Sequence, residues 1–218
     1  AAVPSGLANR EFVAILTNGC QGDINNVDVF HTLPKVEPYV RMKEVAGTLA
    51  KETLRVWKTI RYTDEVPLAG SEEWLPLKVR IPSPTALAAA RSTLANSKDG
   101  PPYKLPAEVF AREAVLVAES IPPVLPVAVQ ALRIGDLALT AFSGEPFVEL
   151  GLEIRKKNPL GNVFPIGLAN GHAGYVPTVE AMELGGYETW LAKSSFLEKD
   201  AAPQMVRSML NQLEKVAG

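Results

Sequence analysis

The sequence predicts an α/β layered domain in which a mixed β-sheet is flanked by helices. Short apolar runs of strand length alternate with segments of helical periodicity through most of the chain, which is typical of layered α/β proteins. Two neighbouring β-type runs are close enough to form a hairpin, so the sheet should contain antiparallel as well as parallel pairs. Of the 218 residues, 47% are hydrophobic and 21% are charged, as in ordinary globular domains.

Charge and composition argue against several classes of protein. The 22 basic and 24 acidic residues give a formal net charge of −2. Neither sign forms a long block, which argues against a nucleic acid or an anionic membrane bound through bulk charge. Cys20 is the only cysteine, so neither an intrachain disulfide nor a multi-cysteine metal site can form. The P-loop, GxGxxG and GxSxG motifs are absent, and no apolar run reaches the roughly 18 residues that span a bilayer.

The first predicted elements are a strand and a helix. Residues 11–17 (EFVAILT) are expected to form a buried strand, because this apolar run contains β-branched residues and stops at Asn18-Gly19. Residues 42–60 are expected to form a helix. Their apolar residues fall at offsets 0, 3, 4, 7, 14, 15 and 18, which places them on one helical face.

A short strand and two helices follow. Residues 77–81 (LKVRI) alternate between apolar and polar, which predicts a strand with one buried face. Residues 83–95 are predicted to be a helix with a proline in its first turn, where the missing N–H costs nothing. Residues 96–104 (NSKDGPPYK) resemble a linker, and residues 106–120 are predicted to be a third helix because their apolar residues share one face.

The predicted hairpin joins residues 125–132 to residues 136–142. A helix should follow from residue 147 and end at Asn158-Pro159, with Lys156 and Lys157 favouring its C-terminal turn.

The last third of the chain is predicted to hold one more strand and one more helix. The strand is expected at residues 162–168 and the final helix at residues 202–216, with an aromatic and glycine-containing loop at residues 173–190 between them.

Three segments place an apolar strand immediately before a small, polar or glycine-rich turn. They lie at residues 18–26, 143–146 and 170–178. Because ligands collect beyond the carboxyl ends of strands in open α/β sheets, we expect these three segments to form one site.

The acidic and aromatic residues of these segments have alternative interpretations. Glu145 can be a charge partner for the start of the next helix, or a ligand aimed from a rigid junction into a cleft. Asp23 can brace its own loop or take a catalytic role. Tyr175 and Tyr187 can be packing residues of a glycine-rich loop.

Histidine and cysteine give a weaker signal. His31 and His172 are the only histidines, and their spacing matches no zinc motif, so each is interpreted as a structural or loop residue. Cys20 lies beside a turn and could be a nucleophile, although no histidine motif accompanies it.

Several blocks of sequence carry a further signal in their order and spacing. They are residues 18–26 (NGCQGDINN), 134–137 (IGDL) running into 143–145 (SGE), 167–178 (GLANGHAGYVPT) and 185–188 (GGYE). Together they resemble the neutral or alkaline (non-lysosomal) ceramidases and their bacterial ceramidase-like relatives. The block at 167–178, with the tyrosine that follows it, is the most specific.

Ceramidases of this family are zinc-dependent amidases that hydrolyse the N-acyl bond of ceramide. The resemblance implies that Glu145 and Tyr175 are zinc ligands and that Tyr187 is an active-site tyrosine that hydrogen-bonds the reacting amide. It also implies catalytic roles for Asp23 and Asn25, which occupy the family's Gly-Asp-x-Ser-Pro motif. Zinc at such a site activates water and polarises the substrate carbonyl.

The sequence departs from the family in two ways. Asn25 stands at the serine position of the motif, and an amide cannot act as a nucleophile, although it can hydrogen-bond a substrate. The family's two zinc-binding histidines lie well upstream of the motif, which begins here at Gly22. His31 and His172 do not occupy those ligand positions. We therefore expect residues 1–218 to be the C-terminal part of the catalytic domain, with a preceding segment lost or supplied by a second chain.

The resemblance thus implies a zinc-dependent hydrolase of an N-acyl amide bond in a ceramide-like lipid, only part of whose site lies in this chain. It also suggests a secreted or periplasmic protein and leaves membrane contact open. One alternative, favoured by Asn25, is a hydrolase of a different amide or ester. Another, favoured by the missing histidines, is a non-catalytic binding module.

Overall fold

The structure is a computed structural model that describes residues 13, 15–28, 30–31, 36–98, 100–103 and 105–218. These residues fall into two compact units. An N-terminal unit holds the described residues up to Val66, except for residues 17–24. The second unit holds residues 17–24 together with residues 67–218.

The N-terminal unit contains helix α1 (Val40–Trp57), which confirms the predicted helix with its bounds shifted by two to three residues. None of its residues is buried, and Met42, Val45 and Leu49 on the predicted apolar face are more than half exposed. The spacing of the apolar residues therefore located this helix correctly even though none of its residues is buried.

The predicted strand at residues 11–17 is wrong for the residues that the structure describes. Residue 13 and residues 15–17 belong to no strand or helix, and residues 11, 12 and 14 lie outside the described part. Val13, Ile15 and Leu16 are 77%, 84% and 89% exposed. An apolar run becomes a buried strand only where a neighbouring strand and a core receive it, and residues 13 and 15–17 pair with no strand that the structure describes.

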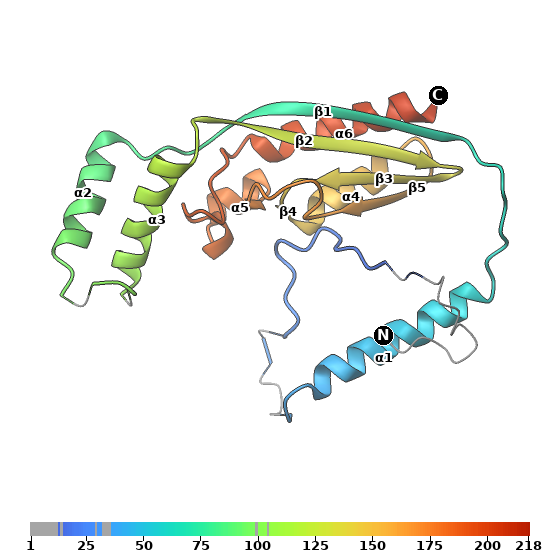
Figure 1. Cartoon of the computed structure of the whole chain (residues 1–218), viewed down its shortest axis with the longest axis horizontal. Helices are drawn as coiled ribbons and strands as arrows, with labels where there is room; N and C mark the ends of the chain where they lie inside the picture. Colours follow the sequence, from blue (N-terminus) through green and yellow to red (C-terminus); the bar gives the residue numbers. More distant parts are fainter. Residues whose placement is uncertain (1–12, 14, 29, 32–35, 99, 104) are drawn as a thin grey trace. The chain divides into compact units, whose positions relative to one another are not determined.

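The second unit is built on a four-stranded sheet in the order β1-β2-β3-β5 (Figure 1). Its strands are β1 (Leu68–Lys78), β2 (Val124–Ile134), β3 (Leu137–Phe142) and β5 (Asn162–Ile166). The pairs β1/β2 and β2/β3 are antiparallel, whereas β3/β5 is parallel. The predicted mixed sheet is thus confirmed.

The hairpin between β2 and β3 is also confirmed, with a tighter turn than predicted. Ile134 pairs with Leu137, which leaves Gly135 and Asp136 as a two-residue turn. Gly135 has a φ of 62°, a conformation that a two-residue hairpin turn requires and that glycine adopts without steric cost.

Strand β1 shares only Leu77 and Lys78 with the predicted strand at residues 77–81, because it begins nine residues earlier, at Leu68, and ends three residues earlier, at Lys78. Its first half contains Gly70, Ser71, Glu72 and Glu73, which are residues that strands disfavour. These residues pair with β2 in unbroken register, so long-range pairing outweighs local propensity here.

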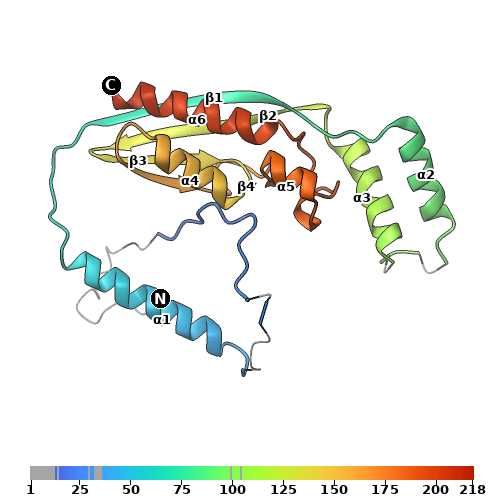
Figure 2. The same cartoon turned by 180° about the vertical axis from the view of Figure 1, so that it is seen from behind.

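One face of the sheet is covered by α4 (Val148–Lys157) and α6 (Ala201–Ala217), which stand in front of it in Figure 2. The bounds of both helices agree with the prediction to within about one residue. The fully buried side chains between the layers are Val129, Phe142, Ile154, Met205, Met209 and Leu213. Each such side chain contributes about 1.5–3 kcal/mol through burial.

Polar side chains on β1 form hydrogen bonds with side chains of α6. The Glu73 carboxylate accepts hydrogen bonds from Ser208 Oγ at 2.6 Å and Gln212 Nε2 at 3.0 Å, and Ser71 donates to Gln212 Oε1. Because buried polar groups are costly when unpaired, this network explains how a strand containing serine and glutamate can face a helix.

The opposite face of the sheet carries exposed apolar side chains. Successive strand residues point to opposite faces, so Trp74, next to Glu73, points away from α6. Among the described residues, Trp74, Ile134 and Phe164 are 60%, 46% and 46% exposed.

Helices α2 (Pro84–Ala95) and α3 (Pro106–Ser120) form a helical hairpin and confirm the predicted bounds. Ser83 Oγ caps α2 by accepting from Ala86 N at 3.2 Å. Helix α3 contacts the segment before α6: the Phe110 and Trp190 rings stack edge to face at 4.8 Å, and Glu113 Oε2 accepts from Lys193 N at 3.0 Å.

The region 173–190, predicted to be a loop, contains short elements. They are β6 (Tyr175–Val176), α5 (Val179–Leu184) and a 3₁₀ turn at Tyr187–Thr189. Thr178 Oγ1 caps α5 by accepting from Ala181 N at 3.0 Å. The loop prediction is therefore wrong for α5.

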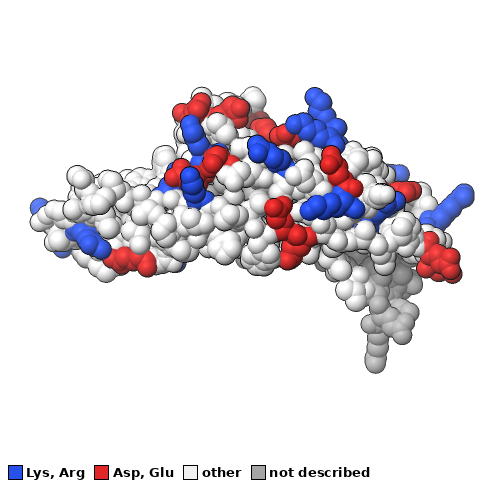
Figure 3. Space-filling view, turned by 90° about the horizontal axis from the view of Figure 1, so that it is seen from above, with Lys and Arg blue, Asp and Glu red and all other residues white. Residues whose placement is uncertain are grey.

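The surface carries both signs of charge. On the face shown in Figure 3, basic and acidic side chains are intermingled. No helix within the described residues combines the length and apolarity needed to cross a bilayer.

Candidate functional site

The turn after β3 and the turn after β5 meet, as predicted. Strand β4 (Glu145–Pro146) pairs in parallel with β6. Backbone hydrogen bonds flank this pair, since Ala173 N donates to Ser143 O at 2.6 Å and Glu145 N donates to Gly174 O at 2.9 Å. The two turns therefore form one backbone assembly.

The third predicted segment joins the same assembly. Gly22 N donates to Pro146 O at 2.9 Å, and Gly167 N donates to Asn18 O at 3.2 Å. The prediction that these three segments gather at one place is confirmed for residues 18–24, which share a unit with the sheet.

Glycines allow the segments to approach this closely. A Cβ on Gly22 would lie 2.5 Å from Glu145 O, and a Cβ on Gly174 would lie 2.5 Å from Ser194 O. Gly174 also has a φ of 74°, which side chains disfavour. Both positions thus require glycine for backbone contact.

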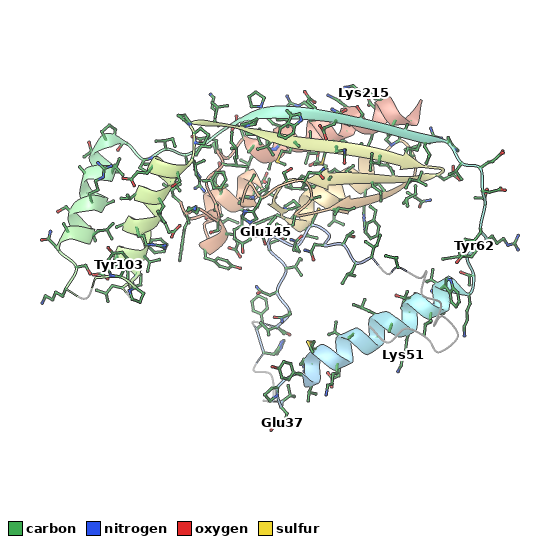
Figure 4. All side chains as sticks on the ribbon, in the orientation of Figure 1. Glu37, Lys51, Tyr62, Tyr103, Glu145 and Lys215 are labelled. Carbon is green, nitrogen blue, oxygen red and sulfur yellow. The ribbon has the colours of Figure 1, made fainter. Side chains whose placement is uncertain are left out.

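Glu145 and Tyr175 are direct partners in the β4/β6 register. Side chains of paired residues on neighbouring strands lie on the same side of the sheet. The Glu145 side chain, labelled in Figure 4, is 24% exposed. The structure therefore places the two predicted metal ligands side by side at a partly solvent-accessible position.

Tyr175 packs against the third predicted site residue. The rings of Tyr175 and Tyr187 lie edge to face with centroids 6.0 Å apart. Loss of hydration raises the pKa of Tyr175 to about 12, and the nearby Tyr187 hydroxyl and the charge of Glu145 add to the rise. Tyr187 is 56% exposed, so a ligand can reach it.

The two histidines occupy different surroundings. His172 Nε2 lies 3.7 Å from Glu145 Oε1, and its side chain is 55% exposed. His31 belongs to the N-terminal unit and pairs with Asp28, with 2.7 Å between Nδ1 and Oδ2. His172, interpreted from the sequence as a structural residue, thus lies beside the predicted metal ligands.

Asp23 braces the site. Its Oδ1 accepts a hydrogen bond from Val148 N at 2.8 Å, at the start of α4. Phe147, the residue before this helix, provides no side-chain cap. The sequence allowed Asp23 to brace its own loop, but the structure shows it capping a distant helix instead. Its catalytic role stays a prediction.

Asn25 differs from the other predicted site residues in the unit to which it belongs. It is exposed and belongs to the N-terminal unit. Its catalytic role stays a prediction.

Cys20 packs against α4. A Cβ on Gly151 would lie 2.6 Å from its sulfur, so the thiol fills space that this glycine leaves open. Burial raises the pKa of Cys20 to about 11. Since the thiolate is the nucleophilic form, this cysteine is poorly suited to attack a substrate.

Arg80 is a positioning residue that sequence reasoning missed. Its guanidinium donates to Thr189 O at 2.7 Å, to Ser195 O at 2.9 Å and to Ser195 Oγ at 3.0 Å. These bonds hold the end of the 3₁₀ turn that carries Tyr187. The only sequence signal was a charged residue within the predicted strand at residues 77–81.

The donor set at this corner suits part of a metal site. Carboxylate oxygen and imidazole nitrogen are common zinc ligands. Within the described residues, no three His, Cys, Asp or Glu side chains form a group that could hold a metal ion. Glu145 offers a carboxylate and Tyr175 a phenol oxygen at this corner, and their role as metal ligands stays a prediction.

The arrangement of these elements is a ceramidase-like fold. The neutral ceramidase from Pseudomonas aeruginosa has a similar structure, with a TM-score of 0.62 and 18% identity over 96% of this chain. A ceramidase complexed with C2 gives a TM-score of 0.57 and 17% identity over 84% of this chain.

The similarity covers only part of each ceramidase. This chain corresponds to 38% of the Pseudomonas aeruginosa enzyme and to 35% of the second structure. No protein-family model matches the sequence, and no curated protein matches it. At these identities the comparison establishes the fold alone.

Proposed function

We propose that this chain carries part of the active site of a zinc-dependent hydrolase that cleaves the N-acyl amide bond of a ceramide-like lipid. The observation that supports this most is the direct pairing of Glu145 with Tyr175 within a ceramidase-like fold. In this proposal, residues 1–218 are the C-terminal part of the catalytic domain, and other residues of the whole protein complete the ligand set.

In the proposed hydrolysis, the site residues of this chain would have separate roles. When bound, the metal supplies a Lewis acid that polarises the scissile carbonyl and activates water. Glu145 and Tyr175 would hold it from two paired strands. Tyr187, a residue that is 56% exposed, would donate a hydrogen bond from its hydroxyl to the oxygen on which negative charge develops. Arg80 and Asp23 keep the neighbouring segments in place.

The test uses the whole protein that contains this chain and a fluorescent short-acyl ceramide. Glu145→Gln removes a charged ligand while keeping the size of the side chain, so we expect kcat/KM to fall by a factor on the order of 100 or more. Glu149→Gln is the matched control, because Glu149 is exposed and lies four residues away on α4. Activity that survives Glu145→Gln, or that resists a zinc chelator, contradicts the proposal.

A second candidate is a hydrolase of a different amide or ester. Asn25 favours it, because an amide stands where the family pattern has a serine. A panel of N-acyl substrates with and without a sphingoid base distinguishes the two. Cleavage of simple N-acyl amides without cleavage of ceramides supports the second candidate, and failure of every substrate with metal present favours a binding module.

A further inference from the structure

We infer that helix α1 binds the surface of a bilayer that contains anionic lipids. Its apolar side chains enter the outer part of the acyl layer, and its basic side chains contact the lipid headgroups. The inference concerns the N-terminal unit alone and goes beyond the proposed hydrolysis. It rests on the proposed function for one step, the lipid nature of the substrate.

One side of α1 is apolar and open to solvent. Met42, Val45, Leu49 and Val56 share this side and are 61%, 58%, 55% and 41% exposed, and no residue of the helix is buried. In proteins, most of the stability of a helix comes from packing its amphipathic face. An apolar partner for this side is therefore expected.

The helix and the turn after it are basic, although the whole chain is slightly acidic. Residues 40–62 contain six Lys or Arg residues and two Glu residues, whereas the formal net charge of the chain is −2. The next acidic residues, Asp64 and Glu65, come after this segment. Attraction to an anionic surface is therefore a local property of α1 and not a bulk property of the protein.

Both acidic residues of α1 are already paired within the helix. Glu44 forms an ion pair with Arg41 at 3.3 Å, and Glu52 forms one with Arg55 at 2.7 Å. Among the residues that the structure describes, no carboxylate pairs with the remaining cations of this segment, which are Lys43, Lys51, Lys58 and Arg61. These cations can face anionic headgroups, each of which adds to the affinity for the surface.

The cations flank the apolar side. Arg41 and Lys43 lie about 100° to either side of Met42 around the helix, and Lys51, labelled in Figure 4, belongs to the side opposite Met42. When the apolar side enters the acyl layer, the flanking cations are at the level of the headgroups. This distribution of charge complements an anionic bilayer.

Aromatic residues stand at both ends of the helix. Tyr39 precedes α1 and is 69% exposed. Trp57 is its last residue, and Trp57 Nε1 donates to the hydroxyl of Tyr62 at 2.8 Å. Tryptophan and tyrosine favour the boundary between headgroups and acyl chains, because each has an apolar ring and a polar tip.

The pattern fits a bilayer better than a second copy of the chain. A coiled coil needs apolar residues at alternating steps of three and four. Met42, Val45 and Leu49 begin such a repeat, but Glu52 and Thr59 stand at positions where it should continue. In addition, the lipid substrate of the proposed function lies in membranes, so the hydrolase has to work at a membrane surface.

The experiment measures co-sedimentation of the untagged 218-residue chain with vesicles. One set contains phosphatidylcholine alone, and the other contains phosphatidylcholine mixed with phosphatidylglycerol. We expect at least about tenfold tighter binding to the mixed vesicles. Binding should weaken as salt is raised, because salt screens exposed charges.

Two variants test the two sides of the helix. Leu49→Gln places a polar side chain of similar helix propensity on the apolar side, so binding to the mixed vesicles should weaken about tenfold or more. Replacing Lys43 and Lys51 together by glutamine should weaken binding about tenfold or more and reduce its salt dependence. Leu105→Gln is the matched control, because Leu105 is 62% exposed and lies outside α1, and it should bind as the unmodified chain does.

Several outcomes overturn the inference. They are a folded chain that binds no mixed vesicles, equal affinity in Leu49→Gln, and a dimer in sedimentation velocity that Leu49→Gln dissociates. Far-UV circular dichroism reports whether each variant is folded. If Leu49→Gln does not fold, the lysine variant and the comparison of the two vesicle types still decide.

The whole protein that contains this chain provides a further test. If it binds no mixed vesicles and Leu49→Gln lowers its free energy of unfolding, the apolar side of α1 packs inside the protein and the inference is wrong. If it binds them and Leu49→Gln weakens that binding without loss of stability, the inference holds for the whole protein.

The proposed function fails separately, because vesicle binding needs neither metal nor hydrolysis. A protein that binds mixed vesicles through α1 but cleaves no N-acyl substrate contradicts the function and leaves the inference standing. A protein that cleaves ceramide in detergent micelles but binds no vesicles does the reverse.

Discussion

Asp23 Oδ1 accepts a hydrogen bond from Val148 N at 2.8 Å across a sequence separation of 125 residues. The carboxylate thereby occupies the position of an N-terminal helix cap, although it belongs to a different segment of the chain. Replacing a capping side chain with alanine costs about 0.5–2 kcal/mol. We expect Asp23→Ala to lower the free energy of unfolding by that amount in urea titrations.

Asp23→Asn separates capping from catalysis. The amide oxygen keeps the acceptor, so the free energy of unfolding should stay within about 0.5 kcal/mol of the unmodified chain. If Asp23 also acts in catalysis, the same variant of the whole protein loses activity while remaining stable. Equal stability of Asp23→Ala and the unmodified chain would show that the cap contributes nothing.

Substitution by alanine should destabilise the fold at Gly22 but have little effect at Gly19. A Cβ on Gly22 would lie 2.5 Å from Glu145 O, whereas a Cβ on Gly19 meets nothing within 4 Å. Gly22→Ala forces backbone to move and should cost about 1–3 kcal/mol. Gly19→Ala should change the free energy of unfolding by less than about 0.5 kcal/mol. Similar costs in thermal or urea unfolding would show that the contact at Gly22 relaxes freely.

Arg80 is expected to stabilise the segment that carries Tyr187. Hydrogen bonds from a charged group contribute about 1.5–3 kcal/mol each, and Arg80 makes three to Thr189 and Ser195. Arg80→Ala should therefore cost about 3 kcal/mol or more and speed amide hydrogen exchange around Thr189.

Arg91 provides the control for Arg80. It forms an exposed ion pair with Glu119 at 3.0 Å, with side chains 58% and 54% exposed, and such pairs contribute about 0–1 kcal/mol. If Arg91→Ala is as destabilising as Arg80→Ala, the three hydrogen bonds are not the cause.

Cys20 should react slowly with alkylating reagents while the protein is folded. Burial raises its pKa from 9.0 to about 11, so at pH 8 the thiolate fraction falls from about one tenth to about one thousandth. Iodoacetamide labelling followed by mass spectrometry should thus be about 100-fold slower than in urea. The folded rate should rise with pH until it approaches pH 11. Equal rates at pH 8 in the folded and unfolded chain would contradict the burial of the sulfur.

The elements that the sequence predicted well are those whose signals are local. Helix α3 (Pro106–Ser120) begins at a proline and keeps its apolar residues on one face, and Ser83 caps α2 through its own first turn. The elements that the sequence did not predict depend on contacts with residues far away along the chain. The first half of β1 is strand because β2 pairs with it and because α6 satisfies Glu73. Helix α5, in contrast, had a local signal in its cap Thr178.

The candidate site also has a part that the sequence predicted and a part that depends on distant residues. Strand-end turns indicated where it would lie, because sheet topology brings such ends together. The pairing of Glu145 with Tyr175 and the approach of His172 depend on register and on loop path, which spacing along the sequence does not give. The capping of α4 by Asp23 and the clamp by Arg80 need contacts over 125 and 109 residues.

These separations also govern the order of folding. The hydrogen bonds from Gly22 to Pro146 and from Val148 to Asp23 close large loops, and their entropic cost is met only once the strands between them are paired. Helices α2 and α3 can form early from local contacts. The corner that carries Glu145 and Tyr175 should instead be among the last regions whose amides gain protection from hydrogen exchange during refolding.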